Sequence, residues 1–240
     1  MFTYDNYMIE QNVIDSDYRY ERKFHITNVF KENVKRLVLQ HPAIFLEQFY
    51  RRNVNNIYFD TFKFKHYFDS VDGSTERIKV RIRWYGKLFG YIEKPVLEFK
   101  IKKGLLGKKL LTAIKPFTLY NNCSFQNVFN NLTYSEFYDL VDIKSLIPTL
   151  INQYSRNYYL SSCGNFRITI DSSMKYFLVS DIVTAPFLKI TDNNSIILEL
   201  KYDANNDYSS DRISNFFPFR MTKISKYVTG LNKLYDDLLP

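Results

Sequence analysis

The sequence contains little cysteine, glycine or proline, and no long apolar run. Its 240 residues include 2 cysteines, Cys123 and Cys163, which form no metal motif and do not suit a disulfide scaffold in a chain of this size. No stretch approaches the roughly 20 apolar residues that a membrane helix needs. The first residues lack the basic and then apolar pattern of a signal peptide. We therefore expect a cytoplasmic protein with reduced thiols and no direct membrane insertion.

Positive charge is in excess. The chain has 33 basic and 25 acidic residues, which gives a formal net charge of +8. Such an excess favours an anionic partner, such as nucleic acid, phosphate or an anionic membrane surface. The hydrophobic content of 45% is enough for one substantial core, so one domain is expected over two. We assign residues 1–17 to a polar lead-in segment and residues 18–240 to a single domain.

Alternating and helical patterns along the chain indicate many strands and a few helices, which is typical of the α+β class. Strands are predicted at 18–26, 54–61, 76–85, 91–102, 151–160, 164–171, 175–183 and 195–203. Helices are predicted at 28–42, with Asn28 as the N-cap and Pro42 as the stop, and at 125–140 and 223–239. The segment KKGLLGKK (102–109) is predicted to be a loop, and residues 62–73 a connector.

One predicted strand carries a positive charge at every second position. Lys79, Arg81 and Arg83 alternate with apolar residues from Val80 to Trp84. Successive side chains on a strand point to opposite faces, so one face is cationic and the other is apolar. Three like charges on one face repel each other unless water or an anion compensates them.

Other predicted strands repeat this division into a charged and an apolar face. Their charged faces contain Arg19, Glu21 and Lys23; Glu98, Lys100 and Lys102; Arg167, Thr169 and Asp171; and Glu199 and Lys201. A solvated outer face would explain each strand separately. If the strands instead close into a barrel with their apolar faces outward against helices, the charged faces line the interior. The joint pattern favours this second interpretation, a cationic tunnel.

Eight ordered segments resemble the polyphosphate polymerase domain of the vacuolar transporter chaperone (VTC) family. They are YRYERKF, IYFDT, DGSTERIKVRIRWYG, LEFKIKKG, INQYSRNYY, FRITID, LELKY and TKISKYVTG, and they cover roughly residues 18 to 232. That family belongs to the triphosphate tunnel metalloenzymes, also called the CYTH-like superfamily. The resemblance implies an α+β fold built on a closed antiparallel eight-stranded β-barrel tunnel with flanking helices.

The resemblance also implies roles for individual residues. Phosphate-binding residues are expected at Arg19, Lys23, Lys79, Arg81, Arg83, Lys100, Lys102, Arg156, Arg167, Lys201, Lys223 and Lys226. Arg81, Arg83 and Glu199 are expected to be catalytic. Glu199 is the first candidate ligand for a divalent metal, Mn or Mg, and Glu21 and Glu98 are further candidates. The alternative for Glu199 is an internal salt bridge to Lys201 or to another neighbour.

The expected activity is transfer of the terminal phosphate of a nucleoside triphosphate, ATP by expectation, onto a polyphosphate chain. Two alternatives remain: a tripolyphosphatase or nucleoside triphosphatase on the same fold, and a non-catalytic polyphosphate-binding module. Hydrolases of the superfamily typically begin with E-x-E-x-K, but here Arg19 replaces the first glutamate, which favours the polymerase. No nucleic-acid partner is expected, and coupling to transport would need a separate membrane partner.

Overall fold

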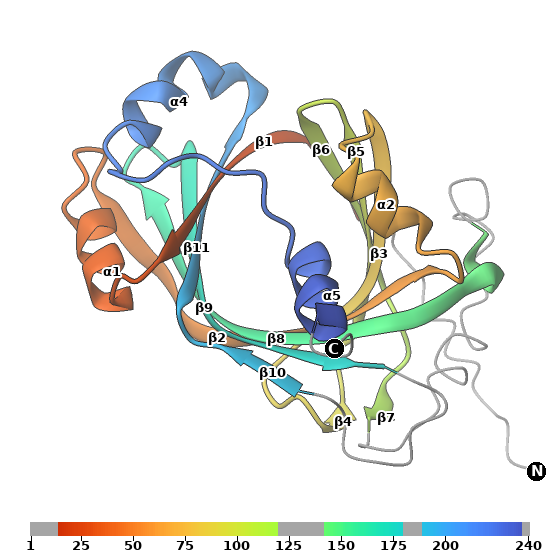
Figure 1. The fold of residues 1–240 in the computed structure, drawn as a ribbon. Helices are drawn as coiled ribbons and strands as arrows, with labels where there is room; N and C mark the ends of the chain where they lie inside the picture. The colour runs from red at the N-terminus through yellow and green to blue at the C-terminus, as the bar shows by residue number, and fades with distance from the viewer. Residues whose placement is uncertain (1–13, 120–141, 180–188, 237–240) are drawn as a thin grey trace, which may run out of the picture.

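The computed structural model describes residues 14–119, 142–179 and 189–236. Eight strands close into an antiparallel ring, because β8 pairs with β2 on one side and with β9 on the other. The order around the ring is β9–β11–β1–β6–β5–β3–β2–β8 and back to β9. These strands are β1 (Ile14–Thr27), β2 (Phe45–Thr61), β3 (Glu76–Tyr85), β5 (Val96–Lys103), β6 (Leu106–Ala113), β8 (Leu146–Ser161), β9 (Phe166–Leu178) and β11 (Ser195–Asp203). Figure 1 shows the ring nearly end on, and the predicted closed eight-stranded tunnel is confirmed.

In the part of the chain that the structure describes, three short strands lie outside this ring. β10 (Lys189–Asp192) pairs with the second half of β9, in line with β11. β4 (Gly90–Ile92) and β7 (Phe117–Leu119) form a separate two-stranded sheet.

Within the described residues, four α-helices flank the strands. They are α1 (Lys31–Leu39), α2 (Lys65–Val71), α4 (Asp207–Ser214) and α5 (Lys226–Asp236), and short 3₁₀ helices cover Ile143–Ser145 and Ala204–Asn206. α1 and α4 lie outside the ring on one side, whereas α5 is seen within the opening of the ring, where it contacts α2 (Figure 1). Among the described helices, none has the length and apolar content that a membrane crossing requires.

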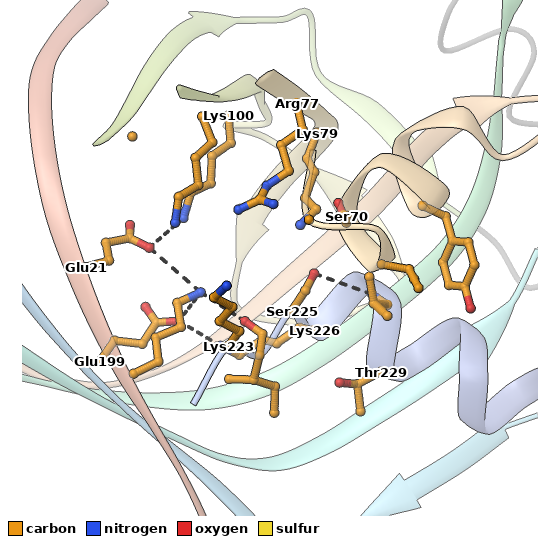
Figure 2. Close-up of a pocket in the computed structure, with 18 of the residues that line it drawn as sticks. Glu21, Ser70, Arg77, Lys79, Lys100, Glu199, Lys223, Ser225, Lys226 and Thr229 are labelled. Atoms are coloured by element: carbon orange, nitrogen blue, oxygen red, sulfur yellow. Dashed lines mark hydrogen bonds and ion pairs between the residues drawn. The ribbon is translucent and has the colours of Figure 1, made fainter. Parts of the chain in front are cut away.

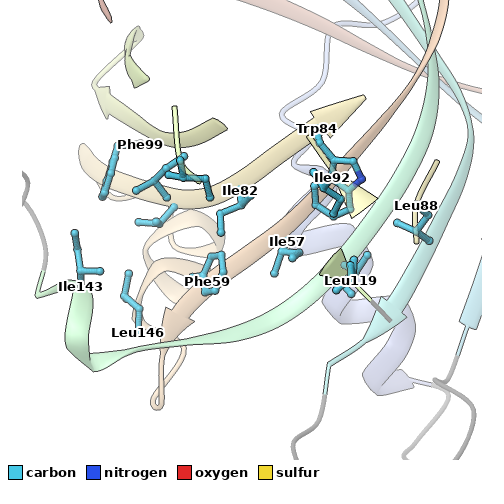
Figure 3. Close-up of a cluster of buried hydrophobic side chains, with 14 of the residues drawn as sticks. Ile57, Phe59, Ile82, Trp84, Leu88, Ile92, Phe99, Leu119, Ile143 and Leu146 are labelled. Atoms are coloured by element: carbon cyan, nitrogen blue, oxygen red, sulfur yellow. The ribbon is translucent and has the colours of Figure 1, made fainter. Parts of the chain in front are cut away.

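Apolar side chains of β3, β5 and part of β2 point outward, as the alternation predicts, whereas a third apolar cluster, which includes Tyr58 and Tyr154, packs against Tyr227 and Leu231 of α5 on the inner side. Ile57, Ile82, Leu97 and Phe99 on β2, β3 and β5 are fully buried in one outer cluster (Figure 3). Among the described residues, those around β4 and β7 cover this part of the ring; they include Leu88, Ile92 and Leu119. On the opposite side, α1 and α4 cover a second outer cluster through Val34, Val38 and Ile213.

The predicted loop at 102–109 is wrong. β5 continues to Lys103 and β6 begins at Leu106, so Gly104 and Leu105 form a two-residue hairpin turn. Gly104 has a φ of 57°, a left-handed conformation that glycine adopts without steric cost. Two glycines among four lysines suggested a solvated loop, but the turn uses only one of them, and Lys109 lies within a strand.

Other element boundaries also differ from the predictions. α1 begins at Lys31, with Phe30 at the N-cap position, and the predicted cap Asn28 has a left-handed φ of 58°. The predicted strand at 175–183 is not separate, since β9 runs unbroken to Leu178. The predicted helix at 125–140 lies outside the described residues. The C-terminal helix begins at Lys226 rather than at residue 223.

The predicted connector at 62–73 contains α2. The carboxylate of Asp60, which is fully buried, accepts hydrogen bonds from the backbone N–H groups of His66 and Tyr67, both at 2.9 Å. It also accepts one from the Tyr227 hydroxyl of α5 at 2.6 Å. One buried carboxylate therefore fixes the first turn of α2 and attaches α5 to the ring.

Candidate phosphate-binding site

A cavity of about 870 Å³ lies within the ring, and most of the charged side chains that line it are basic. They reach it from several strands because side chains alternate between the inner and outer faces of the ring. On β3, this alternation places Arg77, Lys79, Arg81 and Arg83 inside, with the apolar residues between them outside. The charged faces of the strands therefore meet in one cavity.

All predicted phosphate-binding residues except one line this cavity. They are Arg19, Lys23, Lys79, Arg81, Arg83, Lys100, Lys102, Arg156, Lys201, Lys223 and Lys226. The exception is Arg167, which is exposed at the start of β9 and does not belong to the lining. The structure does not bring Arg167 to the site, because alternation determines the face of a side chain but not its depth in the tunnel.

Glu98 lies behind the lining, only 1% exposed. Its carboxylate forms ion pairs with Arg81, with Arg83 at 3.2 Å and with Lys109 at 3.5 Å. Burial opposes ionisation of this carboxyl, but the charges of Arg81 and Arg83 outweigh it and hold its pKa well below the usual range. Glu98 therefore positions two arginines and, unlike Glu21 and Glu199, is not among the residues that line the cavity.

Carboxylates that do reach the interior form a second, larger group of ion pairs. We call this group the carboxylate network; it comprises Glu21, Lys23, Lys100, Arg156, Asp171, Glu199, Lys201 and Lys226. Glu199 pairs with Lys201 at 3.0 Å and with Lys226 at 3.2 Å. Although burial opposes its ionisation, these lysines hold the pKa of Glu199 well below its ordinary value. The salt-bridge alternative for Glu199 is therefore present in the structure.

Asp171 joins the network from β9 and is fully buried. It accepts two hydrogen bonds from Arg156, at 2.5 and 2.6 Å, and pairs with Lys226 at 2.6 Å. The aromatic ring of Tyr154 lies within 5.2 Å of the Arg156 guanidinium and 4.9 Å of the Lys226 ammonium. Two cations from β8 and α5 are thus fixed before any ligand binds.

A second set of lining cations has no such partners. We call Arg77, Lys79, Lys102 and Lys223 the cation row; within the described residues, none of them forms a salt bridge. Figure 2 shows Arg77 and Lys79 pointing from β3 into the cavity beside Lys100. Burial, followed by the charges of Lys23 and Lys100, lowers the pKa of Lys79 well below its ordinary value. An anion that binds here would relieve this mutual repulsion.

Two further lysines have lowered pKa values. Burial lowers the pKa of Lys100 to about 8, although Glu21 favours its charged form from 2.7 Å. Glu98 likewise favours the charged form of Lys109, but burial and the nearby Lys201 lower the pKa of Lys109 to about 7. Part of the positive charge in the cavity therefore titrates near neutral pH.

Sequence reasoning missed several members of the site. Arg77 stands two residues before Lys79 on the same strand face, so the alternation could have included it. Asp171 shares the charged face of its strand with Thr169, but nothing in the pattern showed that it would meet Arg156. Lys109 was hidden in the predicted loop, which gave no reason to place its side chain inside a ring.

Glu21 and Glu199 are the carboxylates that fit a divalent metal best. Both line the cavity, and Lys23 lies 3.8 Å from one and 3.7 Å from the other. The described residues contain no group of three or more His, Cys, Asp or Glu side chains that could hold a metal ion. This donor set suits an ion such as Mg²⁺, which commonly uses one or two carboxylates and takes its other ligands from phosphates and water.

A closed ring of eight antiparallel strands around a cation-lined cavity defines the triphosphate tunnel class. The model of the VTC domain family matches residues 18–235, so the chain belongs to the VTC domain family. The resemblance found in the sequence is therefore confirmed. A comparison with curated protein sequences found no match.

Several solved structures are similar to this chain at low sequence identity. A Hippeastrum protein, described as a candidate adenylyl cyclase with a dominant triphosphatase activity, has a TM-score of 0.51 at 11% identity, over 91% of this chain and 96% of that chain. A candidate adenylate cyclase of Bacillus halodurans gives 0.49 at 15% identity, over 89% and 98%. The PH1819 protein of Pyrococcus horikoshii gives 0.47 at 12% identity, over 90% and 98%. At such identity, the Hippeastrum structure supports the tunnel fold alone.

Proposed function

We propose that this chain transfers the terminal phosphoryl group of a nucleoside triphosphate, ATP by expectation, to the end of a polyphosphate chain inside the tunnel. The observation that carries the proposal is the cavity inside the ring, whose lining combines the cation row with every member of the carboxylate network except Asp171. A thin polyanion fits such a space, whereas a double-stranded nucleic acid does not. Membership of the VTC domain family supports the same substrate class.

Phosphoryl transfer requires mainly position and charge from a protein. Arg81 and Arg83 suit this requirement because their guanidinium groups are already held in place. The Arg81 side chain donates a hydrogen bond to the Tyr58 hydroxyl at 3.0 Å, and Arg83 donates one to the Asn56 side chain at 2.9 Å. Their remaining N–H donors would stabilise charge on the transferred phosphoryl group without reorganisation.

A divalent metal, Mg or Mn, is part of the proposal. Glu199 and Glu21 would hold it, and the ion would supply positive charge to the reacting phosphates. In the structure, both carboxylates form ion pairs with lysines. Lys100 pairs with Glu21, and Lys201 and Lys226 pair with Glu199. We expect these lysines to move toward phosphate oxygens when substrate and metal bind, since each ammonium can exchange one anionic partner for another.

A hydrolase is the second candidate, because the Hippeastrum protein of the same fold is described with a triphosphatase activity. Arg19 argues against it. This residue lines the cavity where hydrolases of the superfamily have a glutamate, and it pairs with Asp203 at 3.0 Å. A cation at this position adds phosphate affinity and removes a metal ligand, which favours a longer phosphate chain over metal-activated water.

The decisive experiment incubates the purified protein with ATP and Mg²⁺ or Mn²⁺. A gel stained for polyphosphate detects chain synthesis, and a colorimetric assay detects free phosphate. Long chains support the proposal. Free phosphate alone contradicts it and supports the hydrolase, and neither product supports a polyphosphate-binding module. A cytoplasmic location and a separate membrane partner for any transport stay predictions.

A further inference from the structure

Arg52 on β2 is surrounded by aromatic rings outside the cavity lining. Its guanidinium carbon lies 4.8 Å from the ring centre of Phe49, 5.0 Å from Tyr50, 5.6 Å from Tyr85 and 5.7 Å from Tyr158. Four rings around one guanidinium displace water from it and stabilise its charge. The rings themselves are partly open to solvent, since Tyr50 is 77% and Tyr85 is 51% exposed. This cluster can therefore receive a ligand from outside the ring.

Several polar atoms in and beside this cluster are buried without partners. They are Nε of Arg52, the hydroxyl of Tyr158 and the hydroxyl of Thr169. Tyr158 and Thr169 are direct neighbours across β8 and β9. Within the described residues, no carboxylate forms a salt bridge with Arg52. Because buried polar groups are normally hydrogen-bonded, several unsatisfied groups in one place indicate a site for a polar ligand.

The strand register places this cluster at the end of the ring away from Arg77. On the inner face of β3, Tyr85 follows Arg83, and on β8, Tyr158 follows Arg156. Arg52 is the direct neighbour of Arg156 across β2 and β8. Burial raises the pKa of Tyr158, and the charges of Arg156 and Arg83 act on the same hydroxyl. The cluster therefore continues the inner surface beyond the last arginines of the cavity.

We propose that Arg52 and Tyr158 bind phosphoryl oxygens of a polyphosphate chain that runs through the ring past the cavity. This proposal rests on the proposed function, because it names the chain as the ligand. The N–H donors of Arg52 are available to oxygen acceptors, because its Nε has no hydrogen-bond partner and, within the described residues, no carboxylate pairs with its guanidinium. From Arg77 to Tyr85, β3 advances eight residues, or roughly 26 Å at about 3.3 Å per residue. A triphosphate does not span that distance, but a long chain does.

The test compares ligands of different length. Binding of tripolyphosphate, long-chain polyphosphate and ATP is measured by calorimetry for the wild type, Arg52→Gln and the control Arg51→Gln. Arg51 is the exposed neighbour with the same charge, and its guanidinium donates a hydrogen bond to Ser155 at 2.7 Å. We expect Arg52→Gln to weaken long-chain binding about tenfold, the scale of a lost charged hydrogen bond, and to leave tripolyphosphate binding unchanged. Arg51→Gln should change either affinity by about twofold at most.

A second variant guards against misfolding of the first. Tyr158→Phe removes only an unpartnered hydroxyl, so it should fold normally and weaken long-chain binding by about fivefold. Equal losses for long and short phosphates, or no loss in either variant, would overturn the proposal. A loss for ATP with none for either phosphate chain would also overturn it, because the rings would then bind the base.

Failure of this proposal is distinguishable from failure of the proposed function. A protein that makes no polyphosphate but shows Arg52-dependent binding of long chains overturns the polymerase and supports this inference. Chain synthesis by a protein whose long-chain binding does not depend on Arg52 or Tyr158 would support the polymerase and overturn this inference.

Discussion

The carboxylate network and the cation row face one cavity with the same types of basic side chain, yet they differ in what holds those side chains. In the network, Glu199 and Asp171 fix Arg156 and Lys226 from several directions. In the cation row, Lys79 has mainly other cations as neighbours. The first arrangement pre-organises donors for a reaction, whereas the second stores repulsion that an anion can release.

This difference suggests a division of labour. A polyanion should be attracted mainly by the cation row, because binding there removes an existing repulsion. Transfer chemistry should depend mainly on the network and on Arg81 and Arg83, since their positions are set in advance by Glu98, Tyr58 and Asn56. Four predictions test the comparison, ordered by expected effect.

The largest difference should be in stability. Lys226→Met should lower the free energy of unfolding by about 3 kcal/mol, because Asp171 and Glu199 lose a cation that they share. Lys79→Met should leave it unchanged or raise it slightly, since it removes repulsion within the cation row. Chemical denaturation of both variants measures the two values. Similar decreases in the free energy of unfolding for the two variants would show that the difference between the carboxylate network and the cation row does not affect stability.

The second effect concerns turnover. Glu199→Gln keeps the size of the side chain and removes the charge that a metal ion needs. We expect metal-dependent turnover to fall at least ~100-fold while polyphosphate binding largely remains, the scale of a lost electrostatic catalytic group. Glu47→Gln is the matched control, because Glu47 pairs with Lys35 in a half-exposed ion pair at 3.5 Å. Normal turnover of Glu199→Gln at saturating metal would show that Glu199 is only a salt-bridge partner and not a metal ligand.

The third effect is pH dependence of binding. A lysine is neutral above its pKa, and Lys109 and Lys100 have pKa values of about 7 and about 8. Raising the pH from roughly 6.5 to 8.5 should therefore remove positive charge from the cavity and weaken tripolyphosphate binding about tenfold, one pKa unit of coupling. Calorimetry in buffers of different ionisation enthalpy should show proton uptake on binding. Lys109→Met should reduce both the pH dependence of the affinity and the proton uptake. A pH-independent affinity in the wild type would contradict the lowered pKa values of Lys109 and Lys100.

The smallest effect is in salt dependence. Polyphosphate affinity should fall steeply as salt rises, because binding releases counterions. Lys102→Gln in the cation row should reduce the slope of log affinity against log salt by about 1, while the exposed control Lys115→Gln should leave it unchanged. The same slope in both variants would place the phosphate contacts elsewhere. Duplex DNA should compete poorly, because the site lies inside a ring.

The sequence by itself determined which residues share a face. The alternation along β3 and β11 predicted those strands with their observed bounds, 76–85 and 195–203, and assigned Arg81, Arg83, Glu199 and Lys201 to charged faces. This worked because the period of two is a property of the extended backbone and does not depend on neighbouring strands. The joint pattern of charged faces indicated a cationic tunnel, and the ordered family segments supported the same interpretation.

Only the tertiary structure determined how deep in the tunnel each side chain lies and which residues it pairs with. Arg167 has the predicted face but lies exposed at a strand end, whereas Lys109 enters the site because a two-residue turn replaces the predicted loop. Asp171 becomes the shared partner of Arg156 and Lys226 only when β8, β9 and α5 meet. Strand register and ring closure set these positions, and both depend on packing between segments far apart in the chain, which local alternation does not encode.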